Sequence, residues 1–320
     1  PGLAAGSAPV GGGPAPMHED AAANAPAGPA AGRYPERNRK APSDWWDASS
    51  VKRQQRSGGA AHAARADPDD KPATIEAALA SPYATEWRLA MDEEMASLHS
   101  NGTWVLEDLP AGAKPIPVKW VFKIKRDAKG NIERFKARLV AKGFMQVEGR
   151  DFTETFAPVS QHATMRTLLS VTAERDLELH HLDVKTAFLN GILEESIYMK
   201  QPPGYKEGGP NKACHLVKSL YGLRQAPRAW HTRLQQELEK MGCIASDADP
   251  GRWIQSVGNT KVYLLIYVDD ILLASDSIDA INTVKESLKA AFDIRDLGEA
   301  TYFLGLEIKR DRLAHSIKLS

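Results

Sequence analysis

The chain has 320 residues, of which 41 are Lys or Arg and 41 are Asp or Glu, so its formal net charge is zero. Hydrophobic residues make up 42% and charged residues 26%, as in globular proteins, and no run of about 18 apolar residues occurs that could form a transmembrane helix. With only two cysteines, Cys214 and Cys243, the sequence excludes a disulfide framework and a Cys-rich zinc module, and it fits a reducing compartment.

Residues 1–72 are predicted to be a disordered leader. Ala (11), Gly (7) and Pro (7) account for 25 of the first 40 residues, so there is too little large apolar surface to offset the entropy lost on ordering. A basic segment around Trp45 and Trp46 is interpreted as a solvated linker, with nucleic-acid contact as the alternative. The chain starts at Pro1 and stops at Ser320 within an apolar–polar alternation, so we expect both ends to be cuts in a longer reading frame.

Residues 73–320 are predicted to fold, as one large domain or two subdomains with a shared core. Thr74 opens one helical stretch, and a second helix is expected over residues 83–100, before Asn101 and Gly102. Its apolar residues recur at helical spacing: Trp87, Met91, Met95 and Leu98. Residues 103–106 are β-like, and residues 118–126 and 132–140 predict a hairpin around the turn at 127–131.

This hairpin is strongly basic. Between Lys114 and Lys142, ends included, lie ten basic residues, and only Asp127 and Glu133 oppose them. Period-two spacing puts cations on one face of each strand, namely Lys123, Lys125, Lys136 and Arg138. Like charges on a shared face repel each other unless an anion is near, so the face is either simply solvated or a clamp for a polyphosphate or nucleic-acid backbone.

Two apolar segments carry acids. The run at 262–268 predicts a buried strand that ends in Asp269 and Asp270, and Asp183 stands between Leu182 and Val184. If the two strands lie side by side, Asp183 and Asp269 would face each other and require a divalent cation, for which oxygen ligands favour magnesium or manganese. The alternative is that each acid caps a turn. With cations nearby to hold a triphosphate, the acids point to nucleotidyl transfer.

Several segments resemble copia-type LTR-retrotransposon reverse transcriptases, in that family's order from about Trp87 to the end. They are KWVFKIK at 119–125, RFKARLVAKG at 134–143, FAPV at 156–159, LDVKTAFLNG at 182–191, SLYGLRQAPRAW at 219–230, YVDD at 267–270 and YFLGLEI at 302–308.

The resemblance implies an α+β fold with the fingers and palm subdomains of a right-hand polymerase, the palm being an antiparallel sheet with helices on one face. The catalytic ligands of two Mg²⁺ ions, for which Mn²⁺ can substitute, would be Asp183, Asp269 and Asp270, with Asp269 the direct ligand of both. Phe188 would close beneath the sugar and exclude a 2′-hydroxyl, with core packing as the alternative. The other implied nucleotide contacts are Lys123, Lys125, Lys136, Arg138, Lys185, Thr186, Ala187 and Gln225. The implied primer grip is Phe303, Leu304 and Gly305.

The implied reaction is attack of a primer 3′-hydroxyl on a deoxynucleoside triphosphate, on an RNA or DNA template. It would occur without a membrane, in a cytoplasmic virus-like particle whose product is destined for the nucleus. An integrase would precede the leader, and most of the thumb and the ribonuclease H domain would follow Ser320. The rival hypothesis is a truncated, non-enzymatic relic that at most binds nucleic acid. The adjacent His180 and His181 point to opposite strand faces and are not predicted to bind metal.

Overall fold

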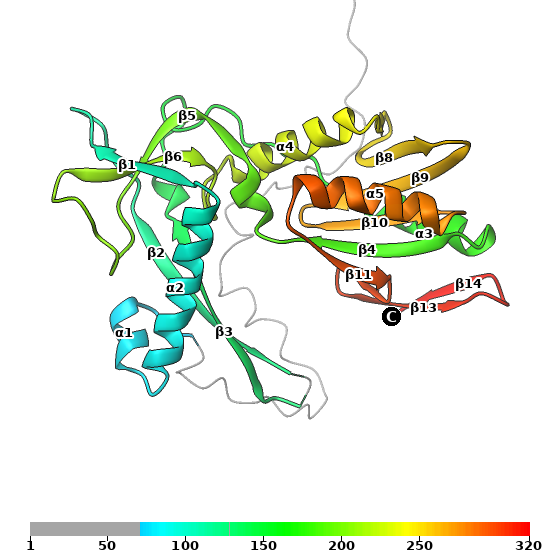
Figure 1. Cartoon of the computed structure of the whole chain (residues 1–320), viewed down its shortest axis with the longest axis horizontal. Helices are drawn as coiled ribbons and strands as arrows, with labels where there is room; N and C mark the ends of the chain where they lie inside the picture. Colours follow the sequence, from blue (N-terminus) through cyan, green and yellow to red (C-terminus); the bar gives the residue numbers. More distant parts are fainter. Residues whose placement is uncertain (1–70, 128) are drawn as a thin grey trace, which may run out of the picture. The chain divides into compact units, whose positions relative to one another are not determined.

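The computed structural model describes residues 71–127 and 129–320, all of which belong to the second of the chain's two contact units, residues 64–320. This part is a mixture of helices and antiparallel sheets (Figure 1), which confirms the predicted α+β class. Apart from residues 71 and 72, the predicted disordered leader, with Trp45 and Trp46, lies outside the described residues. Within the described ranges, no helix is long and apolar enough to cross a membrane.

Two helices open the described part. α1 (Ile75–Ala80) begins where predicted, because the Thr74 hydroxyl accepts a hydrogen bond from the Ala77 backbone amide at 3.2 Å. α2 (Ala84–Ser100) stops at Asn101. The residues that were expected to pack are all buried: Trp87, Met91, Met95 and Leu98. Helical periodicity alone therefore identified the inner face of α2.

Helix α2 packs against a hairpin of β2 (Val118–Arg126) and β3 (Ile132–Ala141), close to the predicted bounds. Lys123 pairs directly with Lys136 in the antiparallel register, so the two cationic rows share one face as expected. The opposite face of β2 is buried and carries Trp120, Phe122 and Ile124. This alternation fixes the register, because a slip by one residue would bury the lysines.

A three-stranded antiparallel sheet shares the apolar core of α2 and the hairpin. Its order is β1–β6–β5, with bounds β1 (Trp104–Asp108), β5 (Ile192–Met199) and β6 (Lys212–Lys218). The chain returns to this core after β4, since β5 and β6 come long after β1 in the sequence.

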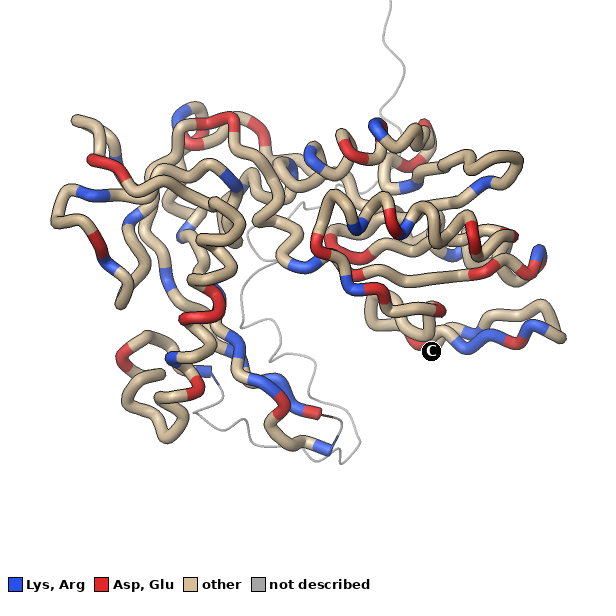
Figure 2. The backbone as a smooth tube through the Cα atoms, viewed as in Figure 1, with Lys and Arg blue, Asp and Glu red and all other residues tan. Residues whose placement is uncertain are grey.

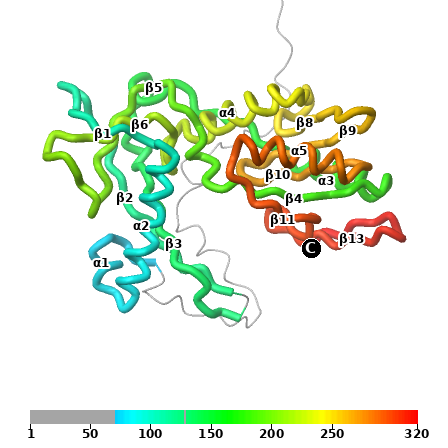
Figure 3. The backbone as a smooth tube through the Cα atoms, in the orientation of Figure 1, coloured from blue at the N-terminus to red at the C-terminus, as the bar shows by residue number. Residues whose placement is uncertain are grey.

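The second part of the chain builds a six-stranded antiparallel sheet in the order β11–β4–β10–β9–β8–β7 (Figure 3). Its strands are β4 (Glu178–Val184), β7 (Ile244–Ser246), β8 (Asp249–Val257), β9 (Thr260–Tyr267), β10 (Asp270–Ser275) and β11 (Ile294–Glu299). β4 comes first in the sequence but lies between the two strands that come late, β10 and β11. That insertion brings the two predicted acidic segments together.

The expectation of helices on one face of this sheet is wrong. On one face, Leu264 and Ile271 join a cluster with residues of α4 (Ala226–Lys240) and α5 (Ile278–Ala291). On the other face, Leu265 and Leu272 pack with a third helix and a small three-stranded sheet. These elements are α3 (His162–Glu174), β12 (Tyr302–Phe303), β13 (Leu306–Asp311) and β14 (Ser316–Leu319). The physical reason is that β9 and β10 are apolar on both faces, so both faces must be covered.

The end of β3 touches the loop before α4 with almost no space between the backbones. A Cβ added to Gly222, whose φ is +89°, would overlap the Ala141 carbonyl oxygen and lie 2.6 Å from Val140 Cγ1. Only glycine accepts both the left-handed conformation and this close approach. The Ala141 amide also donates a 2.8 Å hydrogen bond to the Tyr221 carbonyl, which fixes Tyr221 against the hairpin.

Candidate active site

The two acidic segments meet where β4 ends and β10 begins. Asp183 pairs with Asp270 in the antiparallel register, and the Val184 amide donates a 2.8 Å hydrogen bond to the Asp269 carbonyl. The strand over 262–268 does not itself lie beside the Asp183 strand, as the sequence had suggested, because β10 lies between β9 and β4; it is β10, which follows the two acids, that pairs with β4 and brings the acidic segments together. Asp183 and Asp269 both line one cavity of about 370 Å³.

Asp269 keeps contact with solvent in this cavity, but its charge is disfavoured. Partial burial raises the pKa of its carboxyl, and the nearby carboxylates of Asp270 and Asp183 raise it further. Its own backbone amide and the Arg138 guanidinium oppose the rise. An arrangement that crowds carboxylates in this way is relieved by a cation.

The turn that carries Asp269 is held in an unusual conformation. Val268 has φ +58°, a left-handed value that is strained for a β-branched residue. The indole N–H of the buried Trp230 donates a 2.7 Å hydrogen bond to the Val268 carbonyl. Trp230 in turn packs edge-on against Phe292, with ring centroids 5.1 Å apart. Residues far apart in sequence thus hold the acidic turn in place.

Asp270 has a different partner. His181 Nε2 lies within hydrogen-bond distance of Asp270 Oδ1, at 2.7 Å, and Asp270 is not among the residues that line the cavity. His180 points to the opposite face, where it accepts a 2.7 Å hydrogen bond from the Lys285 ammonium on α5. The prediction that the two histidines face apart is confirmed. Of the three predicted acids, the structure brings Asp183 and Asp269 together in the cavity and turns Asp270 toward His181.

The donor chemistry of this pair fits magnesium. Asp183 and Asp269 offer hard carboxylate oxygens, and Mg²⁺ in nucleotide sites is held by one or two carboxylates, waters and substrate phosphates. Within residues 71–127 and 129–320, no group of three His, Cys, Asp or Glu side chains is arranged to hold a metal ion. Two carboxylates in a cavity large enough for phosphates are therefore the donors that the chain itself supplies.

Lys and Arg recur along the backbone of the hairpin (Figure 2). Of the four predicted cations, Lys136 and Arg138 line the cavity, whereas Lys123 and Lys125 do not. Burial lowers the pKa of the Lys136 ammonium, and Arg138 lowers it further, while Glu94 on α2 opposes the shift. A half-buried lysine among other cations is the environment that an anionic ligand would stabilise.

The loop after Asp183 also contributes to the cavity. Lys185 and Thr186 line it, and the Lys185 ammonium forms a 2.9 Å ion pair with Asp293. Thr186 has φ +51° and precedes the 3₁₀ helix η5 (Ala187–Asn190). Ala187 is buried, and Phe188 packs behind the cavity wall, edge-on to Tyr221 at a centroid distance of 5.7 Å. Tyr221 rather than Phe188 lines the cavity.

Gln225 is buried, and its amide group is occupied by protein partners. Its Nε2 donates to the Asp151 carbonyl at 2.8 Å, and its Oε1 accepts from Gln146 Nε2 at 3.0 Å. Gln146 Oε1 also accepts from the Arg224 amide at 2.8 Å. Gln225 is therefore a structural link between the start of α4 and the segment after the hairpin.

The predicted primer grip lies on the turn between β12 and β13. Leu304 and Gly305 have φ values of +49° and +86°, which reverse the chain. Phe303 is buried, and its ring meets the His181 ring edge-on at 5.4 Å. The turn is thus packed behind the histidine that contacts Asp270.

A family model described as "Reverse transcriptase (RNA-dependent DNA polymerase)" matches residues 101–320. The chain belongs to the reverse transcriptase family. It is 43% identical over 254 residues to the retrovirus-related Pol polyprotein from transposon TNT 1-94 of Nicotiana tabacum. That match covers 79% of this chain and 19% of the polyprotein. The chain is 39% identical over 226 residues to the corresponding polyprotein from transposon RE1 of Arabidopsis thaliana, covering 70% of this chain and 15% of the relative. These matches confirm the copia-type resemblance, and the chain spans less than a fifth of either polyprotein's length.

Sequence reasoning missed several residues of the cavity that holds Asp183 and Asp269. Tyr221 and Arg295 line it directly, and Arg295 pairs with Asp183 across β11 and β4. Glu94 lines it from α2 and accepts a 3.2 Å hydrogen bond from the Leu139 amide. Burial raises the pKa of the Glu94 carboxyl. An acid within the apolar stripe of a helix, such as Glu94, was the signal available in the sequence.

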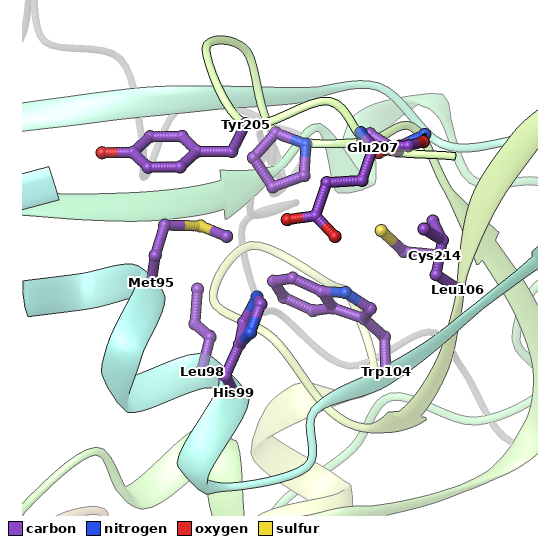
Figure 4. A pocket seen from close by; sticks show the side chains of 10 residues that line it. Met95, Leu98, His99, Trp104, Leu106, Tyr205, Glu207 and Cys214 are labelled. Carbon is purple, nitrogen blue, oxygen red and sulfur yellow. Dashed lines mark hydrogen bonds between the residues drawn. The ribbon is translucent and has the colours of Figure 1, made fainter. Parts of the chain in front are cut away.

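A second cavity of the reverse transcriptase domain, of about 220 Å³, lies between α2, β1 and the segment after β5 (Figure 4). Trp104, Glu207 and Cys214 surround it, and none of the described residues that line it is Lys or Arg. Burial raises the pKa of the Cys214 thiol to about 12, with a contribution from Glu207, so the thiol stays protonated at neutral pH. Without cations, this cavity does not suit an anionic nucleotide.

Proposed function

We propose that this domain carries out template-directed DNA synthesis, in which a primer 3′-hydroxyl attacks a deoxynucleoside triphosphate. The observation that carries the proposal is that Asp183 and Asp269 share a cavity with Lys136 and Arg138. Carboxylates for a metal and cations for phosphates are the two requirements of nucleotidyl transfer. The description of the family as an RNA-dependent DNA polymerase supports RNA as a template. We propose that the domain also copies DNA templates.

Asp183 and Asp269 would hold magnesium, as a pair of ions for which manganese could substitute. When bound, the metal supplies Lewis-acid activation of the attacking hydroxyl and charge neutralisation on the phosphates. Asp270 is proposed to support this site through His181, in addition to the direct ligand role that the resemblance implies. Lys136 and Arg138 would bind the triphosphate and offset its charge.

The remaining predicted residues would contact or position the incoming nucleotide. Lys185, Thr186 and Ala187 would follow the triphosphate, and Phe188 would limit the space at the sugar 2′ position. Lys123 and Lys125 would contact phosphates outside the cavity, on the same hairpin face as Lys136. Gln225 would act on the nucleotide and template base through the loop that its buried amide holds in shape. The turn at Phe303, Leu304 and Gly305 would support the primer end.

In the terms of a right-hand polymerase, we assign α1, α2 and the hairpin to the fingers and the six-stranded sheet to the palm. Both polyprotein relatives are far longer than this chain. We therefore propose that thumb, ribonuclease H and integrase segments belong to the same polyprotein. The setting would be a virus-like particle in the cytoplasm, with a DNA product destined for the nucleus.

The proposal is tested by primer extension with the 320-residue chain on an RNA template in the presence of Mg²⁺ or Mn²⁺. We expect extension by the wild type, none by Asp269→Asn, and wild-type extension by the matched variant Asp279→Asn. Asp279 is an exposed acid in the first turn of α5, remote from the cavity lining. Extension that survives in Asp269→Asn would remove Asp269 from the mechanism. If neither this chain nor one extended past residue 320 is active, the relic hypothesis replaces the proposal.

A further inference from the structure

Tyr221 is one of the residues that line the cavity. It lies in the loop between β6 and α4, and its side chain lines the cavity together with Asp183, Asp269 and Arg138. The Ala141 amide donates a 2.8 Å hydrogen bond to the Tyr221 carbonyl. The next residue is Gly222, where the loop closely approaches β3. Its backbone is therefore fixed from the hairpin side.

The ring of Tyr221 contacts two residues that the proposed function assigns to the nucleotide. The Arg138 guanidinium lies over the ring, 4.9 Å from its centroid. Phe188 meets the ring edge-on, at 5.7 Å and 80°. Stacking restricts the guanidinium to one plane, and the aromatic contact restricts the orientation of Phe188. The ring thus couples the cation for the phosphates to the aromatic residue beneath the sugar.

The hydroxyl of Tyr221 is available for a ligand. None of the described residues forms a hydrogen bond with it, although most half-buried tyrosine hydroxyls have a partner. Burial raises the pKa of Tyr221 to about 12, with Glu94, Asp269 and Asp183 adding to the rise and Arg138 opposing it. The hydroxyl therefore keeps its proton at neutral pH and can donate to an acceptor. The phosphate that Arg138 would bind is an acceptor of this kind.

We infer that Tyr221 contacts the incoming nucleotide, donating a hydrogen bond from its hydroxyl to a triphosphate oxygen while its ring positions Arg138 and Phe188. The inference rests on the proposed function, because it requires the cavity to hold a triphosphate. It separates two roles of one side chain. The hydroxyl contributes affinity for phosphate, and the ring contributes discrimination at the sugar.

The experiment measures binding of labelled dTTP to the 320-residue chain in Mg²⁺ by equilibrium dialysis, with inorganic tripolyphosphate as competitor. Tyr221→Phe keeps the ring and should weaken both dTTP and tripolyphosphate about tenfold or more, because a hydrogen bond to a charged group is lost. Tyr198→Phe is the matched control, since the Tyr198 hydroxyl donates to Glu107 at 2.8 Å and lies outside the cavity lining. Its affinities should equal those of the wild type.

A second variant tests the ring. In primer extension, Tyr221→Leu should lower the preference for deoxynucleotides over ribonucleotides, whereas Tyr221→Phe should keep it. Wild-type affinity for dTTP and tripolyphosphate in Tyr221→Phe, with the wild type binding normally, would overturn the inference and leave the proposed function standing. A wild-type chain that binds neither probe and does not extend a primer would overturn both. Thermal melting of each variant separates a lost contact from a lost fold.

Discussion

The contact between the end of β3 and the loop before α4 makes a quantitative prediction for Gly222→Ala. At φ +89°, an alanine costs about 1–2 kcal/mol in backbone conformation alone. Its Cβ would also overlap the Ala141 carbonyl oxygen and lie 2.6 Å from Val140 Cγ1. Relief requires the backbones to separate, which strains the hydrogen bond between Ala141 and Tyr221 and adds an overpacking cost of about 1–3 kcal/mol. The free energy of unfolding should fall by about 2–5 kcal/mol.

Gly242→Ala is the matched control. Gly242 has φ +77° at the end of α4, and its added Cβ would meet nothing within 4 Å. Only the conformational cost of about 1–2 kcal/mol applies there. Urea unfolding followed by tryptophan fluorescence measures both changes. Equal losses in the two variants would refute the close approach, and a larger loss in Gly222→Ala should be accompanied by weaker nucleotide binding, since Tyr221 is the adjacent residue.

Three further substitutions test the cavity and its supports. Lys136→Met should raise the nucleotide-free melting temperature at neutral pH while weakening triphosphate binding. Because folding lowers the pKa of Lys136, its charge destabilises the fold fully below the folded pKa, and this destabilisation disappears as the pH rises past the unfolded pKa of 10.5. The gain in melting temperature from Lys136→Met should therefore shrink toward that pH. A melting temperature below that of the wild type at pH 7 would contradict this. Trp230→Phe keeps a ring near Phe292 but loses the hydrogen bond to the Val268 carbonyl. Single-turnover kinetics should therefore show a slower chemical step with little change in nucleotide affinity. An unchanged rate would show that this hydrogen bond does not position the turn that carries Asp269. Gln146→Leu should cost about 1–3 kcal/mol in urea unfolding, because the buried Gln225 Oε1 loses its donor and the Arg224 amide loses its acceptor. A loss below about 0.5 kcal/mol would show that the link is dispensable.

Local patterns predicted the elements well. The 3.6-residue spacing of Trp87, Met91 and Leu98 predicted α2, and strict alternation predicted the hairpin with its cationic face. The apolar run before Asp269 predicted β9 because a strand buried on both faces has no polar positions. Each of these signals depends on neighbours within a few residues, so it can be read from the sequence alone.

The same apolar run also shows where sequence reasoning failed. It indicated burial on both faces, yet the expected palm had helices on one face only. The structure covers the second face with α3 and the sheet of β12, β13 and β14. Which distant segment covers an apolar face depends on the three-dimensional path of the chain, and periodicity carries no information about it.

Local patterns also could not predict which of the site residues line the cavity. Asp269 and Asp270 are adjacent in sequence, but one lines the cavity and the other contacts His181. Phe188 was expected at the sugar, but Tyr221, which meets the Phe188 ring edge-on, lines the cavity with Asp183 and Asp269. These differences arise from side-chain direction and packing across strands, which no run of neighbouring residues encodes.

By itself, the sequence determined the family, the elements and the residue types of the site: three acids at the ends of apolar strands and a cationic hairpin. Only the tertiary structure decided which of them meet. The insertion of β4 between β10 and β11 brings Asp183 and Asp269 to one cavity, and the close glycine contact at Gly222 brings Arg138 and Tyr221 to the same place. The physical reason is that register and backbone approach are set by long-range hydrogen bonds and packing, whereas propensity and periodicity act over only a few residues.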